Sequence, residues 1–179
     1  MSGHSVLVVP VPELEPFVRE RHAFYDPAYV SGDPAFTHAH ITALGPFLPD
    51  LDGEAEATVA RIAAATPPFE VALSRIDTFP NGVIHLVPEP DLPFRDLTAR
   101  LFAAFPECPP YGGQFPDTSP HLTLDWTSEH VSEASTRVLL GDLLPARCRV
   151  DRLDLAWYEA DACRVLRSWP LGAQAVSVA

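Results

Sequence analysis

Two short stretches of the chain share one pattern. Residues 37–45 read Thr-His-Ala-His-Ile-Thr-Ala-Leu-Gly, and residues 118–126 read Thr-Ser-Pro-His-Leu-Thr-Leu-Asp-Trp. Aligned on His40 and His121, both read Thr-x-x-His-apolar-Thr. Alternation of polar and apolar residues predicts a strand with one buried face. The histidine and the second threonine of each stretch therefore share one face, and the apolar residue between them faces the core.

The segments around these two strands predict a succession of helices and strands. Apolar, β-branched runs favour strands, whereas charged segments with apolar residues at helical spacing favour helices. Turn signals such as Asn81-Gly82 separate the elements. The expected strands are 6–11, 38–44, 69–79, 83–87, 121–126, 147–158 and 163–169, and the expected helices are 13–25, 53–65, 91–105 and 128–143.

The order of these elements indicates an internal duplication. Strand, helix, strand, turn and strand follow one another over approximately 38–90 and again over 119–170. His40 precedes Asn81 by 41 residues (81 − 40), and His121 precedes Asp161 by 40 (161 − 121). We therefore expect residues 1–179 to form a single bilobal domain. Its fold class is α+β, with pseudo-two-fold duplicated antiparallel or mixed sheets, outer helices and a central cleft.

The composition excludes several classes of function. The formal net charge is −12 and all twelve basic residues are arginine, so duplex DNA is not an expected partner, because its binders neutralise phosphates with basic patches. Apolar runs stay far below the ~20 residues of a membrane span, and no basic region precedes the first one, so we expect a cytoplasmic protein without a membrane partner. No obvious interface segment is visible, and a monomer is expected. The three cysteines lack metal-ligand spacing and are expected to be reduced structural thiols.

The repeated His-x-Thr element is suited to chemistry at phosphorus. A pseudo-two-fold axis would place the two His-x-Thr elements, called the two ladders below, opposite each other. In a displacement at phosphorus, the entering and leaving oxygens lie roughly in line. One of His40 and His121 can take a proton from the attacking oxygen while the other gives a proton to the leaving oxygen. Thr42 and Thr123 can donate hydrogen bonds to the non-bridging oxygens. This is acid–base catalysis without a metal, and either histidine can have either role.

Two alternatives remain open from the residues alone. His38 and His40 have the i, i+2 spacing that can chelate Zn²⁺ or Fe²⁺, which would make a metal-dependent hydrolase. The third ligand would be one of His85, His121 and Asp125. The second stretch has Ser119 where the first has His38, so the shared element is His-x-Thr, and His38 is then expected to line the pocket or support it. A non-catalytic module that binds a nucleotide or cyclic phosphate is the other alternative.

Further residues are candidates for binding the rest of a ligand. Tyr111 and Phe115, in the loop before the second motif, can stack on a base, with Trp157 behind them. Arg75 and Arg152 are the candidate cations for a phosphate, although arginines at strand edges are more often solvated. The histidines expected on the surface are His4, His22 and His130.

The twin motif is similar to a known signature. H-I-T-A at 40–43 and H-L-T-L at 121–124 resemble the paired H-x-[ST]-x motifs of the 2H phosphoesterase superfamily, and within it the chain resembles bacterial proteins of the 2'-5' RNA ligase family. The resemblance covers nearly the whole chain. It includes V-L-V-V-P-V-P near the start, F-P-N-G-V-I-H-L at 79–86 and P-P-Y-G-G-Q-F-P at 109–116.

The resemblance implies a function and a set of roles. It implies hydrolysis of a 2',3'-cyclic phosphate, or a related small cyclic phosphodiester, to a 2'-phosphomonoester, with 2'-5' RNA ligation in some members and without a cofactor. It also implies that His40 and His121 are the acid–base pair and that Thr42 and Thr123 bind the phosphate. Many members offer basic surface to RNA, and this acidic chain does not. We therefore expect a small cyclic nucleotide or a short RNA end as the ligand.

Overall fold

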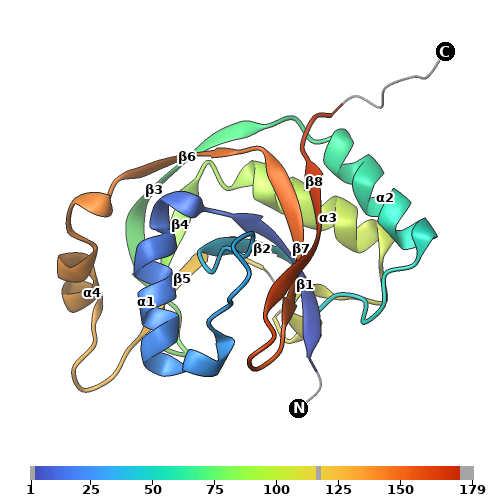
Figure 1. Ribbon diagram of the computed structural model, residues 1–179. Coiled ribbons are helices and arrows are strands. Elements are labelled where there is room, and N and C mark those ends of the chain that lie inside the picture. Colours follow the sequence, from blue (N-terminus) through green and yellow to red (C-terminus); the bar gives the residue numbers. More distant parts are fainter. Residues whose placement is uncertain (1–2, 116–117, 174–179) are drawn as a thin grey trace.

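The computed structural model describes residues 3–115 and 118–173, which form one curved antiparallel sheet and its covering helices (Figure 1). The strands are β1 (His4–Pro10), β2 (His40–Leu44), β3 (Phe69–Thr78), β4 (Val83–Glu89), β5 (Leu122–Trp126), β6 (Ala146–Val150), β7 (Arg152–Tyr158) and β8 (Arg164–Pro170). The α-helices are α1 (Glu15–Tyr25), α2 (Gly53–Ala64), α3 (Leu92–Ala104) and α4 (Glu133–Leu140). The 3₁₀ turns are η1 (Pro12–Leu14), η2 (Pro27–Tyr29), η3 (Pro110–Gly113) and η4 (Gly141–Leu143).

The sheet consists of two four-stranded halves joined in the middle. Its strand order is β6-β3-β4-β5-β2-β1-β7-β8, and β2 pairs with β5 through Ile41 and Leu122. Both of these side chains are fully buried. The α+β class and the antiparallel halves are confirmed. The halves are not separate sheets, however, because the two His-x-Thr strands themselves pair and make the sheet continuous.

The main core lies between the helices and one face of the sheet (Figure 1). In Figure 1, α1 and α4 cover the half that contains β5 and β3, whereas α2 and α3 cover the half that contains β2 and β8. The alternation in β1 separates the two faces. Leu7 and Val9 belong to the main core beneath the helices, whereas Val6 and Val8 join a smaller apolar cluster on the opposite face.

Most expected elements differ from the structure by one or two residues at an end, and two differ by more. The helix expected over 128–143 begins only at Glu133, because Ser132 and Ser135 form a reciprocal capping box. It ends at Leu140, and the next residue, Gly141, has a φ of +49° in the left-handed region.

The strand expected over 147–158 is two strands, which end and begin on either side of Asp151. β6 pairs with β3 in one half of the sheet, whereas β7 pairs with β1 in the other half. The segment therefore crosses from one half to the other, which alternation along the sequence did not reveal.

The order of elements is compatible with a duplication whose two copies begin and end at other elements than those proposed from the sequence. Strand, helix, strand, helix and strand follow one another from β1 to β3 and again from β4 to β7, with β6 as an added edge strand. In this frame β2 and β5 occupy equivalent central positions. The duplication itself stays a proposal.

Two expectations from the composition, on the cysteines and on membrane spans, can be compared with the described residues. All three cysteines are buried and unpaired, as expected for reduced structural thiols. Among the helices of residues 3–115 and 118–173, none is long and apolar enough to cross a membrane.

Candidate active site

The pairing of β2 with β5 brings the two His-x-Thr ladders together. Because Ile41 lies opposite Leu122 in an antiparallel pair, the register sets His40 across from Thr123 and Thr42 across from His121. These four side chains lie on the face away from the main core, and all are half-buried. The structure thus brings together the four residues that the sequence singled out, from opposite halves of the sheet.

Both motif histidines are held by the same local contact. The Nδ1 atom of His40 lies 2.7 Å from the carbonyl oxygen of His38, and Nδ1 of His121 lies 2.8 Å from the carbonyl oxygen of Ser119. A carbonyl oxygen only accepts hydrogen bonds, so Nδ1 of each neutral ring carries the proton. The Nε2 atom of each imidazole is therefore the nitrogen left to exchange a proton with a ligand.

The surroundings of His40 keep its ring neutral. Burial lowers the pKa of His40 to about 4, although the hydrogen bond to the carbonyl of His38 opposes this shift. Positive charge on His22, His121 or His38 would lower the pKa further, and the effect of His121 reflects its position near His40. The hydroxyl of Tyr158, on β7, lies 3.4 Å from Nδ1 of His40.

Aromatic rings surround His121. The ring of Phe79 meets it edge-on with centroids 4.9 Å apart, and that of Tyr111 stacks on it at 6.0 Å. His85 lies 5.4 Å away and stacks on Phe79 at 3.8 Å. Burial lowers the pKa of His121, and His85 adds to the shift, while the bond to the carbonyl of Ser119 opposes it.

Tyr111 connects the two ladders from a strained backbone position. Its φ of +51° lies in the left-handed region, which a residue with a Cβ rarely adopts, and Gly112 continues the turn at +64°. Its amide donates to the carbonyl of Gly45 at 2.7 Å. Its side chain lines one hollow together with Thr42 and stacks on His121. This backbone conformation places the Tyr111 ring next to both motifs, beside Thr42 and against His121.

Two hollows flank Thr123 in the cleft. The first has a volume of about 440 Å³ and includes the predicted residues Tyr111, Phe115, His121 and Thr123, together with Phe79 and Asn81. The second has a volume of about 430 Å³. Most of its lining residues are aromatic or histidine side chains, and Arg21 also lines it. These lining residues include His4, Arg21, His22, Tyr25, Tyr29, Thr123, Trp126 and Tyr158.

The sequence analysis missed the second hollow, because α1 and β5 contribute to it from distant parts of the chain. Arg21 of α1 donates from Nη2 to Oδ1 of Asp125 at 2.9 Å, and its Nε lies 2.9 Å from Oδ2. The Tyr25 hydroxyl also bonds to Asp125. His22, expected on the surface, is half-buried here.

Three other candidates from the sequence lie away from the cleft. Arg75 is 54% exposed and pairs with two acidic side chains, those of Asp77 and Glu89. Arg152 pairs with Asp154. Trp157 hydrogen-bonds with Glu159 and packs against Arg164, whereas its neighbour Tyr158 faces His40.

His38 does not form a chelate with His40. β2 begins only at His40, and the His38 ring turns into a buried position where Nδ1 lies 2.6 Å from Oε1 of Glu15. Its Nε2 accepts from the amide of Ser31 at 3.1 Å. Both ring nitrogens are therefore occupied. Within residues 3–115 and 118–173, no group of three or more His, Cys, Asp or Glu side chains has the geometry of a metal site.

The lowered pKa of His40 predicts a fall in stability on acidification. An unfolded histidine takes up a proton near pH 6.5, whereas folded His40 resists protonation down to about 4. The unfolded state therefore binds more protons between pH 6.5 and 4, and the free energy of unfolding must fall as pH falls through this window. We expect thermal unfolding midpoints to show a smaller decline for His40→Asn than for wild type. The same decline in both would contradict the assignment, and His130→Asn, at an exposed position, is the control.

Comparisons with known proteins agree with this architecture. The family model of the 2'-5' RNA ligase superfamily matches residues 10–162. Comparison with curated proteins gives no match. Among solved structures, TT0787 of Thermus thermophilus is 22% identical, with a TM-score of 0.63 over 96% of this chain and 100% of that one.

The crystal structure of E. coli LigT complexed with 3'-AMP is 19% identical, with a TM-score of 0.61 over 96% of this chain and 98% of that one. LigT complexed with phosphate gives 17% identity and a TM-score of 0.53, over 94% of this chain and 96% of that one. At these identities the structures show a shared fold, and the family model extends over most of the sequence. The chain belongs to the 2'-5' RNA ligase superfamily.

Proposed function

We propose that this protein is a metal-independent phosphoesterase that opens a nucleoside 2',3'-cyclic phosphate, or a related small cyclic phosphodiester, to a 2'-phosphomonoester. The observation that carries the proposal is the matched pair of imidazoles. His40 and His121 come from two paired strands, and a backbone carbonyl accepts from Nδ1 of each. Each ring therefore keeps Nε2 for proton transfer, which is what a reaction with two opposed ends requires.

The reaction balances with these two groups alone. One imidazole takes a proton from water as the water oxygen bonds to phosphorus. The bond between phosphorus and the 3' oxygen breaks, and the other ring, which enters the reaction as the imidazolium, gives its Nε2 proton to that oxygen. The product keeps the phosphate on the 2' oxygen. Exchange with solvent then restores the two protonation states.

The neighbouring side chains suit the rest of such a substrate. Thr42 and Thr123 can donate hydrogen bonds to the non-bridging oxygens, where charge develops. Tyr111 and Phe115 line the hollow of about 440 Å³ beside His121, and rings in such a position stack on a nucleobase. E. coli LigT, which shares the fold, has been crystallised with 3'-AMP and with phosphate.

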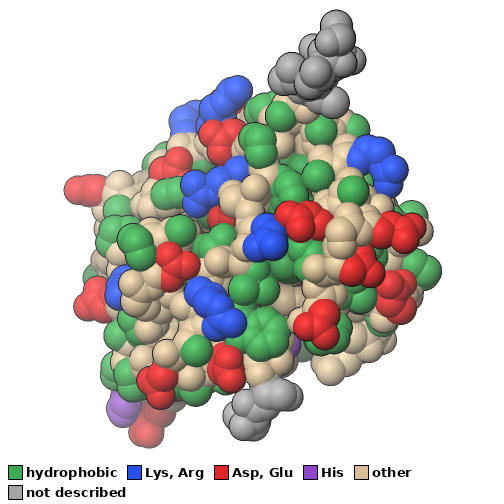
Figure 2. Space-filling model, turned by 45° about the vertical axis from the view of Figure 1, so that its right-hand side comes forward, with side chains coloured by type: hydrophobic (Ala, Val, Ile, Leu, Met, Phe, Trp, Pro, Cys, Tyr) green, Lys and Arg blue, Asp and Glu red, His purple; other side chains and the backbone are tan. Residues whose placement is uncertain are grey.

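The surface charge supports a small ligand over a long RNA. The net charge is −12. On the face in Figure 2, arginine side chains lie scattered among acidic ones and do not form one continuous basic area. Long nucleic acids need several phosphates to be neutralised, whereas a single cyclic phosphate needs only local hydrogen bonds.

The proposal predicts that each motif histidine is required. With 2',3'-cyclic AMP, CMP, GMP and UMP in EDTA, we expect turnover to 2'-phosphates, identified by chromatography against 2' and 3' standards. His40→Ala and His121→Ala should each lower kcat by roughly 10²–10⁴, because each removes one general acid–base group. His130→Ala, at an exposed position, should keep wild-type kcat.

Other outcomes would identify other functions. Wild-type kcat in both single variants would exclude the proposed mechanism. Loss of activity in EDTA and its return with a divalent cation would indicate a metal-dependent hydrolase. Tight binding of these nucleotides without any product would indicate a binding module.

The hollow beside Trp126 favours a second candidate function, the joining or cleavage of a 2'-5' linkage. A cyclic mononucleotide needs one nucleoside pocket, yet hollows of about 440 and 430 Å³ share Thr123 as a lining residue. A phosphodiester that joins two nucleosides would occupy both. In ligation, the 5' oxygen of the second nucleoside takes the place of water, bonds to phosphorus and displaces the 3' oxygen.

This second candidate predicts different effects on two substrates. Trp126 is 47% exposed and lines only the second of these hollows. Because stacking contributes about 1–3 kcal/mol per base, Trp126→Ala should raise KM for cleavage of a 2'-5' linked dinucleotide by roughly 5-fold to 100-fold. KM for a cyclic mononucleotide should stay unchanged. Equal changes with both substrates, or none, would contradict a second nucleoside subsite, and Phe115→Ala is the comparison variant because it should affect both.

A further inference from the structure

We propose that Glu15 is a positioning residue for His40, and that its carboxylate acts through the His38–Ala39 peptide group to hold the imidazole and to stabilise it when it takes up a proton. The catalytic meaning of this inference rests on the proposed function. The structural part, which concerns the hydrogen-bond chain and the tautomer of His40, stands without it.

A single peptide group joins the carboxylate to the imidazole. Oε2 of Glu15 accepts from the amide of Ala39 at 2.9 Å. The carbonyl oxygen of the same peptide group, on His38, accepts from Nδ1 of His40 at 2.7 Å. A negative charge at the amide end polarises the peptide and makes its carbonyl oxygen a stronger acceptor. The negative charge of Glu15 is thereby felt at His40 without direct contact.

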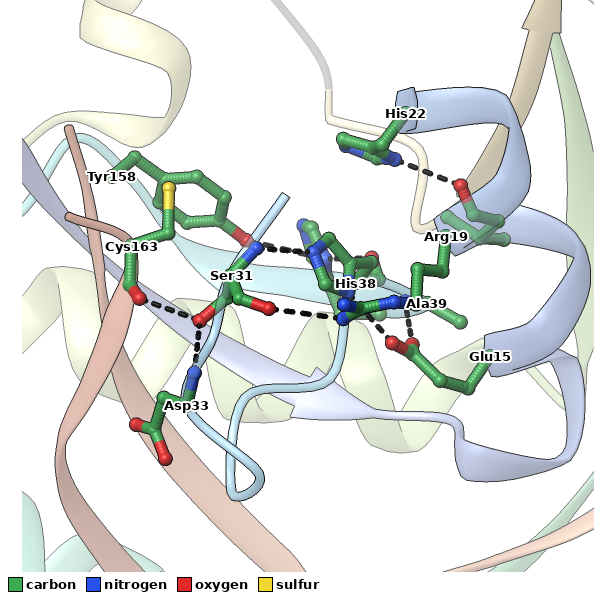
Figure 3. Close-up of polar contacts among 11 residues, drawn as sticks. Glu15, Arg19, His22, Ser31, Asp33, His38, Ala39, Tyr158 and Cys163 are labelled. Carbon is green, nitrogen blue, oxygen red and sulfur yellow. Dashed lines mark hydrogen bonds and ion pairs between the residues drawn. The ribbon is translucent and has the colours of Figure 1, made fainter. Parts of the chain in front are cut away.

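The carboxylate is fixed by a partly buried network (Figure 3). Oε1 of Glu15 lies 2.6 Å from Nδ1 of His38, and Nε2 of His38 accepts from the amide of Ser31 at 3.1 Å. Because Nε2 accepts, Nδ1 of neutral His38 carries a proton and donates it to Glu15. The Ser31 hydroxyl donates to the carbonyl of Cys163 at 2.5 Å, which connects the network to the loop before β8.

The network keeps Glu15 charged. Burial raises the pKa of Glu15, but hydrogen bonds from His38 and from the amide of Ala39, together with the electrostatic effect of His38, lower it by more, so the pKa lies below its ordinary value. A carboxylate that accepts two such bonds has little freedom to turn. Its position on the first turn of α1 therefore transmits the placement of that helix to the start of β2.

The second motif has no equivalent of this arrangement. Nδ1 of His121 bonds to the carbonyl of Ser119, but the next residue is Pro120, which has no amide hydrogen. A carboxylate cannot bind at that end of the peptide group. The two histidines thus share the hydrogen bond from Nδ1 to a carbonyl, but only the peptide group that His40 contacts also binds a carboxylate.

Several titratable groups face His40 from the elements packed around it. They are His22 from α1, His38 from the preceding segment, His121 from β5 and Tyr158 from β7, while Glu15 of α1 lies behind the His38–Ala39 peptide group. Positive charge on His22, His38 or His121 would lower the pKa of His40, and burial raises that of Tyr158. Among these described groups, Glu15 is the one that carries negative charge at neutral pH.

The test is nuclear magnetic resonance of the full chain labelled with ¹⁵N in histidine, together with kinetics. In Glu15→Gln we expect the Nδ1 proton of His40 to move upfield and exchange faster, while the signals of His121 stay in place. The acid limb of kcat/KM should move to lower pH, because the protonated imidazole loses support. We expect kcat to fall by roughly 10-fold to 100-fold, as is common for groups that orient a functional histidine.

A merely structural role for Glu15 gives the opposite shift. If its loss only loosened the site, water would reach His40 and its pKa would rise toward the ordinary value. An upward shift, or an unchanged His40 signal with wild-type kcat, would overturn the proposal. Glu20→Gln, at an exposed position on the same helix, is the control and should alter neither signal.

The wild-type spectrum tests the proposal even if Glu15→Gln does not fold. We expect His40 to be the Nδ1–H tautomer, with its proton further downfield and slower to exchange than that of His121. The Nε2–H tautomer at His40, or equivalent protons on the two rings, would contradict the inference. Absence of turnover on every substrate would refute the proposed function while leaving these signals as they are.

Discussion

The pairing of Ile41 with Leu122 determines the rest of the architecture. Both side chains are buried beneath the helices, and their strands lie antiparallel at the centre of the sheet. Because strand side chains alternate, burying these two residues turns His40, Thr42, His121 and Thr123 to the opposite face. A one-residue slip of either strand would bury its histidine and expose a core residue. Core packing therefore fixes the registration of the site, and the same contact joins the two halves of the sheet.

The sequence predicted what depends on local pattern. Alternation around His40 and His121 gave both central strands, and Asn81-Gly82 gave the turn between β3 and β4. It did not predict the break at Asp151, because a strand that changes partners keeps its alternation on both sides of the break. It also did not predict one continuous sheet, since the pairing of β2 with β5 joins segments 81 residues apart (122 − 41). Such pairing depends on packing across the whole core.

The supporting residues of the site were the hardest to predict. His38 was considered as a metal ligand because of its spacing from His40, but the chain turns before β2 and buries its ring against Glu15. Glu15 itself looked like one of many helix carboxylates. Tyr158 and Trp157 are adjacent in sequence on opposite faces, and the register of β7 with β1 decides which one faces the cleft. Phe79 gave no signal beyond a strand end, yet it lies against His121.

We propose that two imidazoles act from opposite sides of one phosphorus atom in a single displacement. The most direct measurement is the stereochemical course of hydrolysis. One diastereomer of a nucleoside 2',3'-cyclic phosphorothioate would be opened in ¹⁸O-labelled water and the configuration of the product determined. We predict inversion at phosphorus, because water enters opposite the departing 3' oxygen. Retention would show two successive displacements through a covalent intermediate and would contradict the account.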